Sequence, residues 1–160
     1  KAVTLAMAVS VGDLRLDDMT MDAPAQKVER LSYCLYRSSA APGLDAPALD
    51  YLLEKSRIRN LELGLSGCLH YENGIFFQWL EGPSSALYPL LSKLEEDSRP
   101  INSTVLDQGS LGQRIFDQWQ MRFSDSQVAS LFSWLKTQNK TNVSADDYAQ
   151  KVKNFMKSIG

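Results

Sequence analysis

Apolar positions along the chain follow two different periods, and these periods predict its strands and helices. Five segments have the two-residue alternation, or the aromatic and β-branched content, that is typical of strands. We predict these strands at residues 31–38, 64–71, 75–81, 101–109 and 119–123. Two segments between them have apolar residues at helical spacing. One helix is predicted from Asp45 to about Asn60, and the other from Gly82-Pro83 to Ser98-Arg99-Pro100.

The order of these elements indicates a fold class. The dipeptide Asn73-Gly74 between the second and third strands is a strong signal for a two-residue hairpin. The full order is then β-α-β-β-α-β-β, and its first six elements match the split βαβ arrangement of ferredoxin-like α+β folds. In that arrangement strands one and three are neighbours, and the two helices cover one face of the sheet.

The second face of the sheet also requires a cover, because apolar residues point both ways from the third strand. Phe76 and Leu80 lie on one side with Gln78, whereas Phe77 and Trp79 lie on the other. An apolar face of that size is rarely left exposed. The C-terminal segment offers two helices, one opening at Ser124 with Gln127 and one at Ser144 with Asp147. The first would bury Val128, Leu131, Phe132 and Leu135, and the second Tyr148, Val152, Phe155 and Met156. We expect both to dock on the second face, in their own subunit or in a partner's.

Three segments follow from this pattern. Residues 29–123 form the core domain, and residues 124–160 form a C-terminal helical cap. Residues 1–28 are an N-terminal extension, either an added edge strand or a flexible tail. A chain of 160 residues is one domain by length.

Composition excludes several classes of function. The net charge is −2 and no basic patch stands out, which argues against a nucleic-acid partner. No apolar run reaches the length of a membrane span, so we expect no membrane partner. Cys34 and Cys68 lack the pairing of a zinc motif, and with one histidine, His70, they argue against a metal site. Buried thiols are typical of the reducing cytoplasm, which is the location we expect.

The candidate chemistry is a set of polar side chains that the strand pattern directs to one side. A buried Gln such as Gln78 requires a hydrogen-bond partner, because an unpaired buried amide costs about 1–3 kcal/mol. Strand parity places Tyr36 on the same face, and Asn60 ends the inward stripe of the first helix. These three residues suit a flat heterocycle with carbonyl and imide edges. A polar cluster that satisfies itself is the alternative. His70 lies within a strand, and we interpret it as structural.

Residues 31–123 resemble the BLUF family of blue-light sensors that use flavin. The resemblance is carried by Tyr36-Arg37-Ser38, Arg59-Asn60-Leu61, Leu65-Ser66-Gly67, the segment from Gly74 to Gly82, and Trp119-Gln120-Met121. It implies non-covalent binding of FAD between the two helices. Pro100 departs from the family pattern, in which many relatives have His after an Arg.

The resemblance also implies roles for individual residues. Tyr36 would donate an electron and a proton to the excited flavin, and Gln78, between Tyr36 and the ring, would be left rotated or tautomerised. Asn60 would hold the polar edge of the ring, and Arg59 and Arg99 could contact the ribityl-phosphate side. Trp119 and Met121 would carry the signal outward. The implied cofactor-binding residues are thus Tyr36, Arg59, Asn60, Gln78 and Arg99, and the implied signalling residues are Trp119 and Met121.

The resulting expectation is a photoreceptor that is not itself an enzyme. The 37 residues after 123 are too few for a cyclase or phosphodiesterase module, so we expect output through a protein partner or a homo-oligomer. Two other classes share the topology. A small acyl-phosphate hydrolase would require a basic phosphate-binding loop after the first strand, and residues 39–43 carry no charge. A nucleic-acid-binding module would require a basic sheet face.

Overall fold

A single mixed sheet organises the molecule. The computed structural model describes residues 29–97, 103–137 and 145–160. The five strands lie in the order β4-β1-β3-β2-β5. The pairs β4/β1, β1/β3 and β3/β2 are antiparallel, and the pair β2/β5 is parallel. The predicted α+β ferredoxin-like order is thereby confirmed. The elements are β1 (Leu31–Ser39), α2 (Ala46–Leu63), β2 (Ser66–Glu72), β3 (Ile75–Pro83), α3 (Ser84–Asp97), β4 (Thr104–Leu111), β5 (Arg122–Asp125), α4 (Leu131–Thr137) and α5 (Ala145–Ile159).

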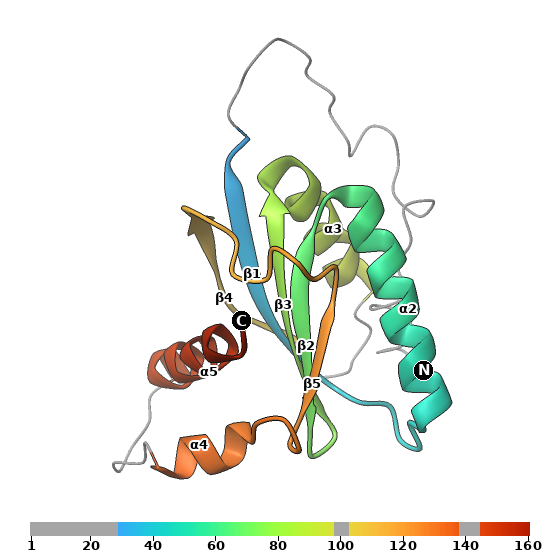
Figure 1. Ribbon diagram of the computed structural model, residues 1–160, viewed down its shortest axis with the longest axis vertical. Coiled ribbons are helices and arrows are strands. Elements are labelled where there is room, and N and C mark those ends of the chain that lie inside the picture. The colour runs from blue at the N-terminus through green and yellow to red at the C-terminus, as the bar shows by residue number, and fades with distance from the viewer. Residues whose placement is uncertain (1–28, 98–102, 138–144) are drawn as a thin grey trace.

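Helices cover the sheet on both faces, and each face has its own apolar core. Helices α2 and α3 lie on one side, and α4 and α5 lie on the other (Figure 1). The core under α2 and α3 includes Tyr36, Leu52, Phe76, Leu80 and Leu90. The core under α4 and α5 includes Leu35, Phe77, Trp79, Phe155 and Met156. The expected cover for the second face is therefore supplied by the same chain.

Helix α2 begins where the sequence indicates and ends one turn later. The Asp45 side chain accepts a hydrogen bond from the Ala48 backbone N–H at 2.9 Å, as an N-cap does. The helix continues past Asn60 to Leu63, and Gly64 then adopts a left-handed conformation with φ of 67°. Gly64 was expected to open the second strand, but this conformation makes it the C-cap of the helix. The hairpin at Asn73-Gly74 is as predicted, with positive φ at both residues.

Three other element boundaries differ from the predictions. Strand β3 extends to Pro83, which pairs with Leu31 at the end of the ladder, so α3 starts at Ser84. Strand β4 extends to Leu111 because it pairs with β1 along that length. Strand β5 starts at Arg122, whereas a strand from Trp119 was predicted. The preceding backbone is bonded outside the ladder: the Trp119 carbonyl accepts from the Gly67 N–H at 2.9 Å.

The C-terminal helices are partly as predicted. On α5, Val152, Phe155 and Met156 are buried, which confirms the expected inward stripe. The helix expected to open at Ser124 instead opens at Leu131, because Ser124 is a buried residue of β5. Val128 therefore precedes the helix and is 60% exposed. Residues 1–28, Arg99, Pro100 and Ser144 lie outside the described residues, so the predictions made for them stay predictions.

Candidate functional site

Tyr36 and Gln78 face each other across adjacent strands. Tyr36 lies on β1 and Gln78 on β3, and the two are direct partners in the antiparallel register. Direct partners in such a ladder project to the same face, and their Cβ atoms lie about 4.5–5.5 Å apart. Tyr36 belongs to the core under α2 and α3, and the two side chains are 4% and 1% exposed. The register confirms that Tyr36 and Gln78 are paired on neighbouring strands, and that their side chains meet as a functional pair stays a prediction.

The Gln78 carboxamide retains unused hydrogen-bonding capacity. Its Nε2 atom is buried and has no hydrogen-bond partner among the residues that the structure describes. On the same face of β1, the buried Ser38 hydroxyl is in the same situation. A native fold rarely leaves such groups unsatisfied, since each costs about 1–3 kcal/mol. Two of them below one pair of helices indicate a polar ligand.

Asn60 and Arg59 form a buried polar pair at the end of α2. The Arg59 guanidinium donates to Asn60 Oδ1 from Nε and Nη2 at 3.1 and 2.9 Å. Asn60 Nδ2 in turn donates to the Gln120 carbonyl at 2.5 Å. Burial lowers the pKa of Arg59 to about 10, so its side chain keeps a positive charge at neutral pH inside the protein. The Asn60 amide thus connects α2 to the backbone that precedes β5.

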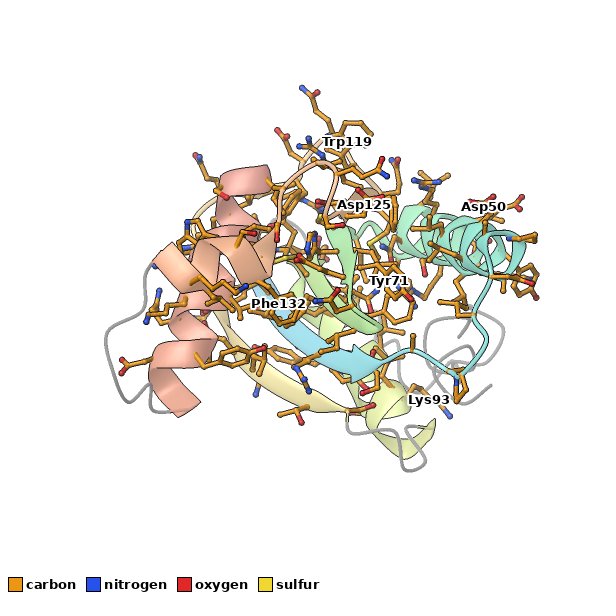
Figure 2. The ribbon with its side chains drawn as sticks, turned by 90° about the horizontal axis from the view of Figure 1, so that it is seen from below. Asp50, Tyr71, Lys93, Trp119, Asp125 and Phe132 are labelled. Carbon is orange, nitrogen blue, oxygen red and sulfur yellow. The ribbon has the colours of Figure 1, made fainter. Side chains whose placement is uncertain are left out.

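The two predicted signalling residues occupy opposite environments. Met121 is buried in the core under α2 and α3, and its carbonyl accepts from Arg57 Nε at 3.0 Å. The Trp119 side chain is 47% exposed, and the Arg122 guanidinium lies 5.5 Å from the centre of its ring. Figure 2 shows Trp119 at the periphery of the molecule. In this state, therefore, Met121 is the residue of the two that lines the site.

The sequence analysis missed Arg57, which no motif marks. Arg57 lies three residues before Asn60, so both project from one side of α2. Together they donate to two consecutive carbonyls, those of Gln120 and Met121. Spacing alone could have placed Arg57 beside Asn60, but nothing in the sequence shows which backbone atoms meet them.

The opposite face of the sheet carries two buried carboxylates that the sequence analysis also missed. Glu81 accepts from the Trp79 indole N–H at 3.0 Å and from the backbone N–H groups of Ile115 and Phe116 at 2.9 and 2.5 Å. Glu72 lies 2.9 Å from His70 Nε2. Both carboxylates thus find partners within the described part of the chain, and the interpretation of His70 as structural stays a prediction.

Among the described residues, the thiols and acidic side chains do not gather into a metal-binding cluster. Cys34 and Cys68 are buried and are not joined in a disulfide, and burial raises the pKa of Cys68 to about 12. A thiol with so high a pKa is a poor nucleophile at neutral pH. Within residues 29–97, 103–137 and 145–160 no group of three or more His, Cys, Asp or Glu side chains is arranged to hold a metal ion.

Fold and site together define a small α+β domain with a buried polar site on the sheet face that α2 and α3 cover. The comparisons specify the family. Residues 31–122 match the family described as BLUF, sensors of blue light using FAD. That range is more than half of the chain, and the chain belongs to the BLUF family. Its domain is therefore a flavin-binding light sensor by family.

Curated relatives and solved structures agree with this family assignment. The chain is 31% identical over 113 residues to the photoactivated adenylate cyclase subunit beta of Euglena gracilis, and 32% identical over 107 residues to that of Euglena longa. These matches cover 71% and 67% of this chain but only 13% and 12% of the cyclase subunits. The dark-state structure of the BLUF protein BlrB matches with a TM-score of 0.63 and 26% identity, covering 82% of this chain and 99% of that one. In the described part of the chain, no helix is both long enough and apolar enough to cross a membrane.

The residues present fit a flavin. The buried, unsatisfied Nε2 of Gln78 is a donor suited to a ring carbonyl or nitrogen. The apolar core under α2 and α3, which includes Leu52, Leu87 and Met121, provides the kind of environment that a planar aromatic ring requires. Arg59 adds one buried positive charge.

Proposed function

We propose that this protein is a blue-light photoreceptor that binds FAD non-covalently between α2, α3 and the sheet. The observation that carries the proposal is the Tyr36–Gln78 pair, directly opposed on β1 and β3, with an unsatisfied amide nitrogen on Gln78. Family membership supports a flavin. FAD, named in the family description, is preferred here to FMN, although one structure of the similar protein BlrP1, 28% identical to this chain, is described as holding FMN.

Four residues are proposed to hold the cofactor beside Tyr36. Gln78 donates from Nε2 to the ring, and Asn60 and Arg59 form the polar end of the site. Asn60 already bonds Arg59 and the Gln120 carbonyl, so its role toward the ring includes setting the position of those two groups. Arg99 is assigned to the phosphate side, as the family resemblance implies.

When bound, the flavin supplies blue-light absorption and an excited state that accepts an electron. Tyr36 supplies that electron together with its phenolic proton, and both return to it. Gln78, the direct partner of Tyr36 in the β1–β3 register, would be left with its carboxamide rotated or tautomerised. A carboxamide can exchange donor and acceptor in place, so the change requires little movement of heavy atoms. Gln78 would then offer the ring a different hydrogen bond, and the expected result is a small red shift that reverses in darkness.

Output is proposed to leave through the segment that Asn60 and Arg57 hold. Their bonds to the carbonyls of Gln120 and Met121 connect the site to the start of β5, where Trp119 and Met121 can exchange environments. A local change must bias a two-state element to have an effect elsewhere. We propose that β5 with α4 and α5 is this element, and that the output is association with a protein partner or with a second copy, without a catalytic reaction. The Euglena relatives, named as cyclase subunits, provide precedent for linkage to an effector.

Matched substitutions on the two faces of the sheet test the proposal. In purified protein loaded with FAD, Tyr36→Phe and Gln78→Leu should retain flavin absorption and lose the light-induced red shift. Tyr33→Phe is the control, because it removes a phenolic hydroxyl from the same strand on the opposite face. It should keep the shift. Protein that binds no flavin, or a shift that survives both test substitutions, would refute the proposal.

A further inference from the structure

The end of β5 is joined to β2 by a buried imidazole. Ser124 Oγ lies 3.0 Å from His70 Nδ1, and His70 Nε2 lies 2.9 Å from Glu72 Oε2. Ser124 and His70 are fully buried, and Glu72 is nearly so. With Glu72 ionised, Nε2 donates to the carboxylate, and in the neutral ring Nδ1 accepts from the Ser124 hydroxyl. We call Ser124, His70 and Glu72 the relay.

The other end of the relay is the start of α4. Glu72 accepts from Ser130 Oγ at 2.6 Å and from the backbone N–H of Leu131 at 2.8 Å. A third donor, the Phe132 N–H, lies at 3.4 Å. The first N–H groups of a helix have no partner within the helix, so an acceptor from outside must satisfy them. A carboxylate on β2 therefore caps a helix that lies 59 residues further along the chain.

Strand β5 is well placed to move against β2. It has four residues, lies at one edge of the sheet and pairs with β2 alone among the described strands. The residues just before it are held by Asn60 and Arg57, from the cofactor side of the sheet. A change in those bonds would shift β5 along β2, and Ser124 would shift relative to His70.

We propose that the relay transmits displacement of β5 to the N-terminus of α4, and so releases or secures that helix according to the state of the light site. This inference rests on the proposed function. If Ser124 withdraws, His70 Nδ1 loses its partner and the ring is no longer held in the orientation that keeps Nε2 on Glu72. The carboxylate then holds the cap less firmly. Helix α5 contacts the same elements directly, because Phe155 packs on the His70 ring and Arg122, at the start of β5, donates to the Ile159 carbonyl.

Substitutions at two serines distinguish an effect on the relay from an effect on the helix cap. Ser124→Ala removes the link between β5 and His70 without deleting any group that donates to Glu72, so it should leave α4 in its released state in darkness as well as in light. Ser130→Ala weakens the cap, because Ser130 Oγ donates to Glu72 and accepts from the Ser133 N–H at 3.1 Å. It leaves the link between Ser124 and His70 intact. Hydrogen–deuterium exchange of the α4 amides, in the FAD-loaded full chain in darkness and under blue light, measures both effects. The red shift is recorded on the same samples.

The two variants should behave differently. We expect light to speed α4 exchange in the wild type, and Ser124→Ala to reduce that light-dependent difference by roughly fivefold or more while keeping the red shift. Ser130→Ala should speed exchange about fivefold in darkness and keep a light-dependent difference. If Ser124→Ala does not fold, Ser124→Cys, nearly isosteric and a weaker hydrogen-bonding partner, takes its place.

The remaining outcomes separate this inference from the function on which it rests. A wild type without a red shift would refute the proposed function. A normal red shift with α4 exchange unchanged by light would overturn the relay alone. The relay would also be overturned if the Ser124 variant kept the full light-dependent difference in α4 exchange. Loss of that difference in Ser130→Ala would overturn it too, because the coupling would then depend on the stability of α4 and not on the link to β5.

Discussion

The two faces of the sheet satisfy their buried polar groups to different extents. On the face under α4 and α5, the Glu81 carboxylate accepts from an indole and two backbone N–H groups, and Glu72 accepts from a serine and the start of a helix. On the face under α2 and α3, Gln78 Nε2 and Ser38 Oγ are buried without a partner in the described part of the chain. The first face is not complete in this respect, because Arg37 Nε, on that side of β1, is also buried without a partner among the described residues. The difference therefore lies in the carboxylates, which are satisfied within the protein, and in Gln78 and Ser38, which retain hydrogen-bonding capacity.

The largest expected effect comes from removing one carboxylate. Glu81→Leu should lower the free energy of unfolding by about 3–5 kcal/mol, because it leaves the N–H groups of Trp79, Ile115 and Phe116 unpaired. Gln78→Leu should change the stability of the flavin-free protein by no more than about 1 kcal/mol, since its amide nitrogen has no protein partner to lose. Urea denaturation at 25 °C measures both. Equal losses would mean that the two faces do not differ in this respect.

The next effect is a dependence on pH. Burial acts to raise the pKa of Glu72, but hydrogen bonds from Ser130, His70, and the Leu131 and Phe132 N–H groups outweigh it and hold the pKa below the ordinary 4.5. A carboxyl whose pKa is lower in the folded state stabilises the fold above its unfolded pKa. That contribution should disappear as the pH falls from about 4.5 through the lower folded value.

Urea midpoints between pH 7 and pH 3 test this expectation. The wild type should lose more stability over that range than Glu72→Gln, whose side chain does not titrate. Burial acts to raise the pKa of Asp107, but its bonds to Lys153 and Tyr33 outweigh this effect and lower that pKa. The wild type and Glu72→Gln share the contribution of Asp107, so it does not affect the comparison. Identical slopes would contradict the assigned role of Glu72.

The smallest effect concerns the attachment of α5 to the sheet. Lys153 Nζ lies 2.8 Å from an Asp107 carboxylate oxygen and 2.7 Å from the Tyr33 hydroxyl. The ion pair is partly exposed, so Lys153→Met should cost at most about 1 kcal/mol. Met keeps an apolar side chain over the Tyr33 ring. A urea measurement that gives a loss above about 2 kcal/mol would show that this contact matters more than a surface ion pair should.

Much of the core could be predicted from local pattern. Alternation in residues 75–81 assigned Phe76, Gln78 and Leu80 to one face and Phe77 and Trp79 to the other, because a strand has a period of two. The order of elements then made β1 and β3 neighbours, which brought Tyr36 to Gln78. Boundaries were less predictable. Gly64, Pro83 and Ser124 are each compatible with more than one element. Strand pairing placed Pro83 in β3 and Ser124 in β5, and the left-handed conformation of Gly64 ended α2.

The polar contacts between distant segments were not predictable. Glu72, Glu81 and Arg57 looked like ordinary charged residues in the sequence. Their partners lie 59, 34 and 64 residues away along the chain, at Leu131, Ile115 and Met121. No local period reports on such distances.

The sequence by itself determined the order of elements, the two apolar faces and the motif that resembles a flavin-based light sensor, because side-chain periodicity follows from backbone geometry alone. Only the tertiary structure decided that Met121 lies inside and Trp119 outside, and that Asn60 and Arg57 bond the backbone before β5. It also decided that a carboxylate on β2 caps α4. Those outcomes depend on which segments meet in space, where burial forces each polar atom to find a partner.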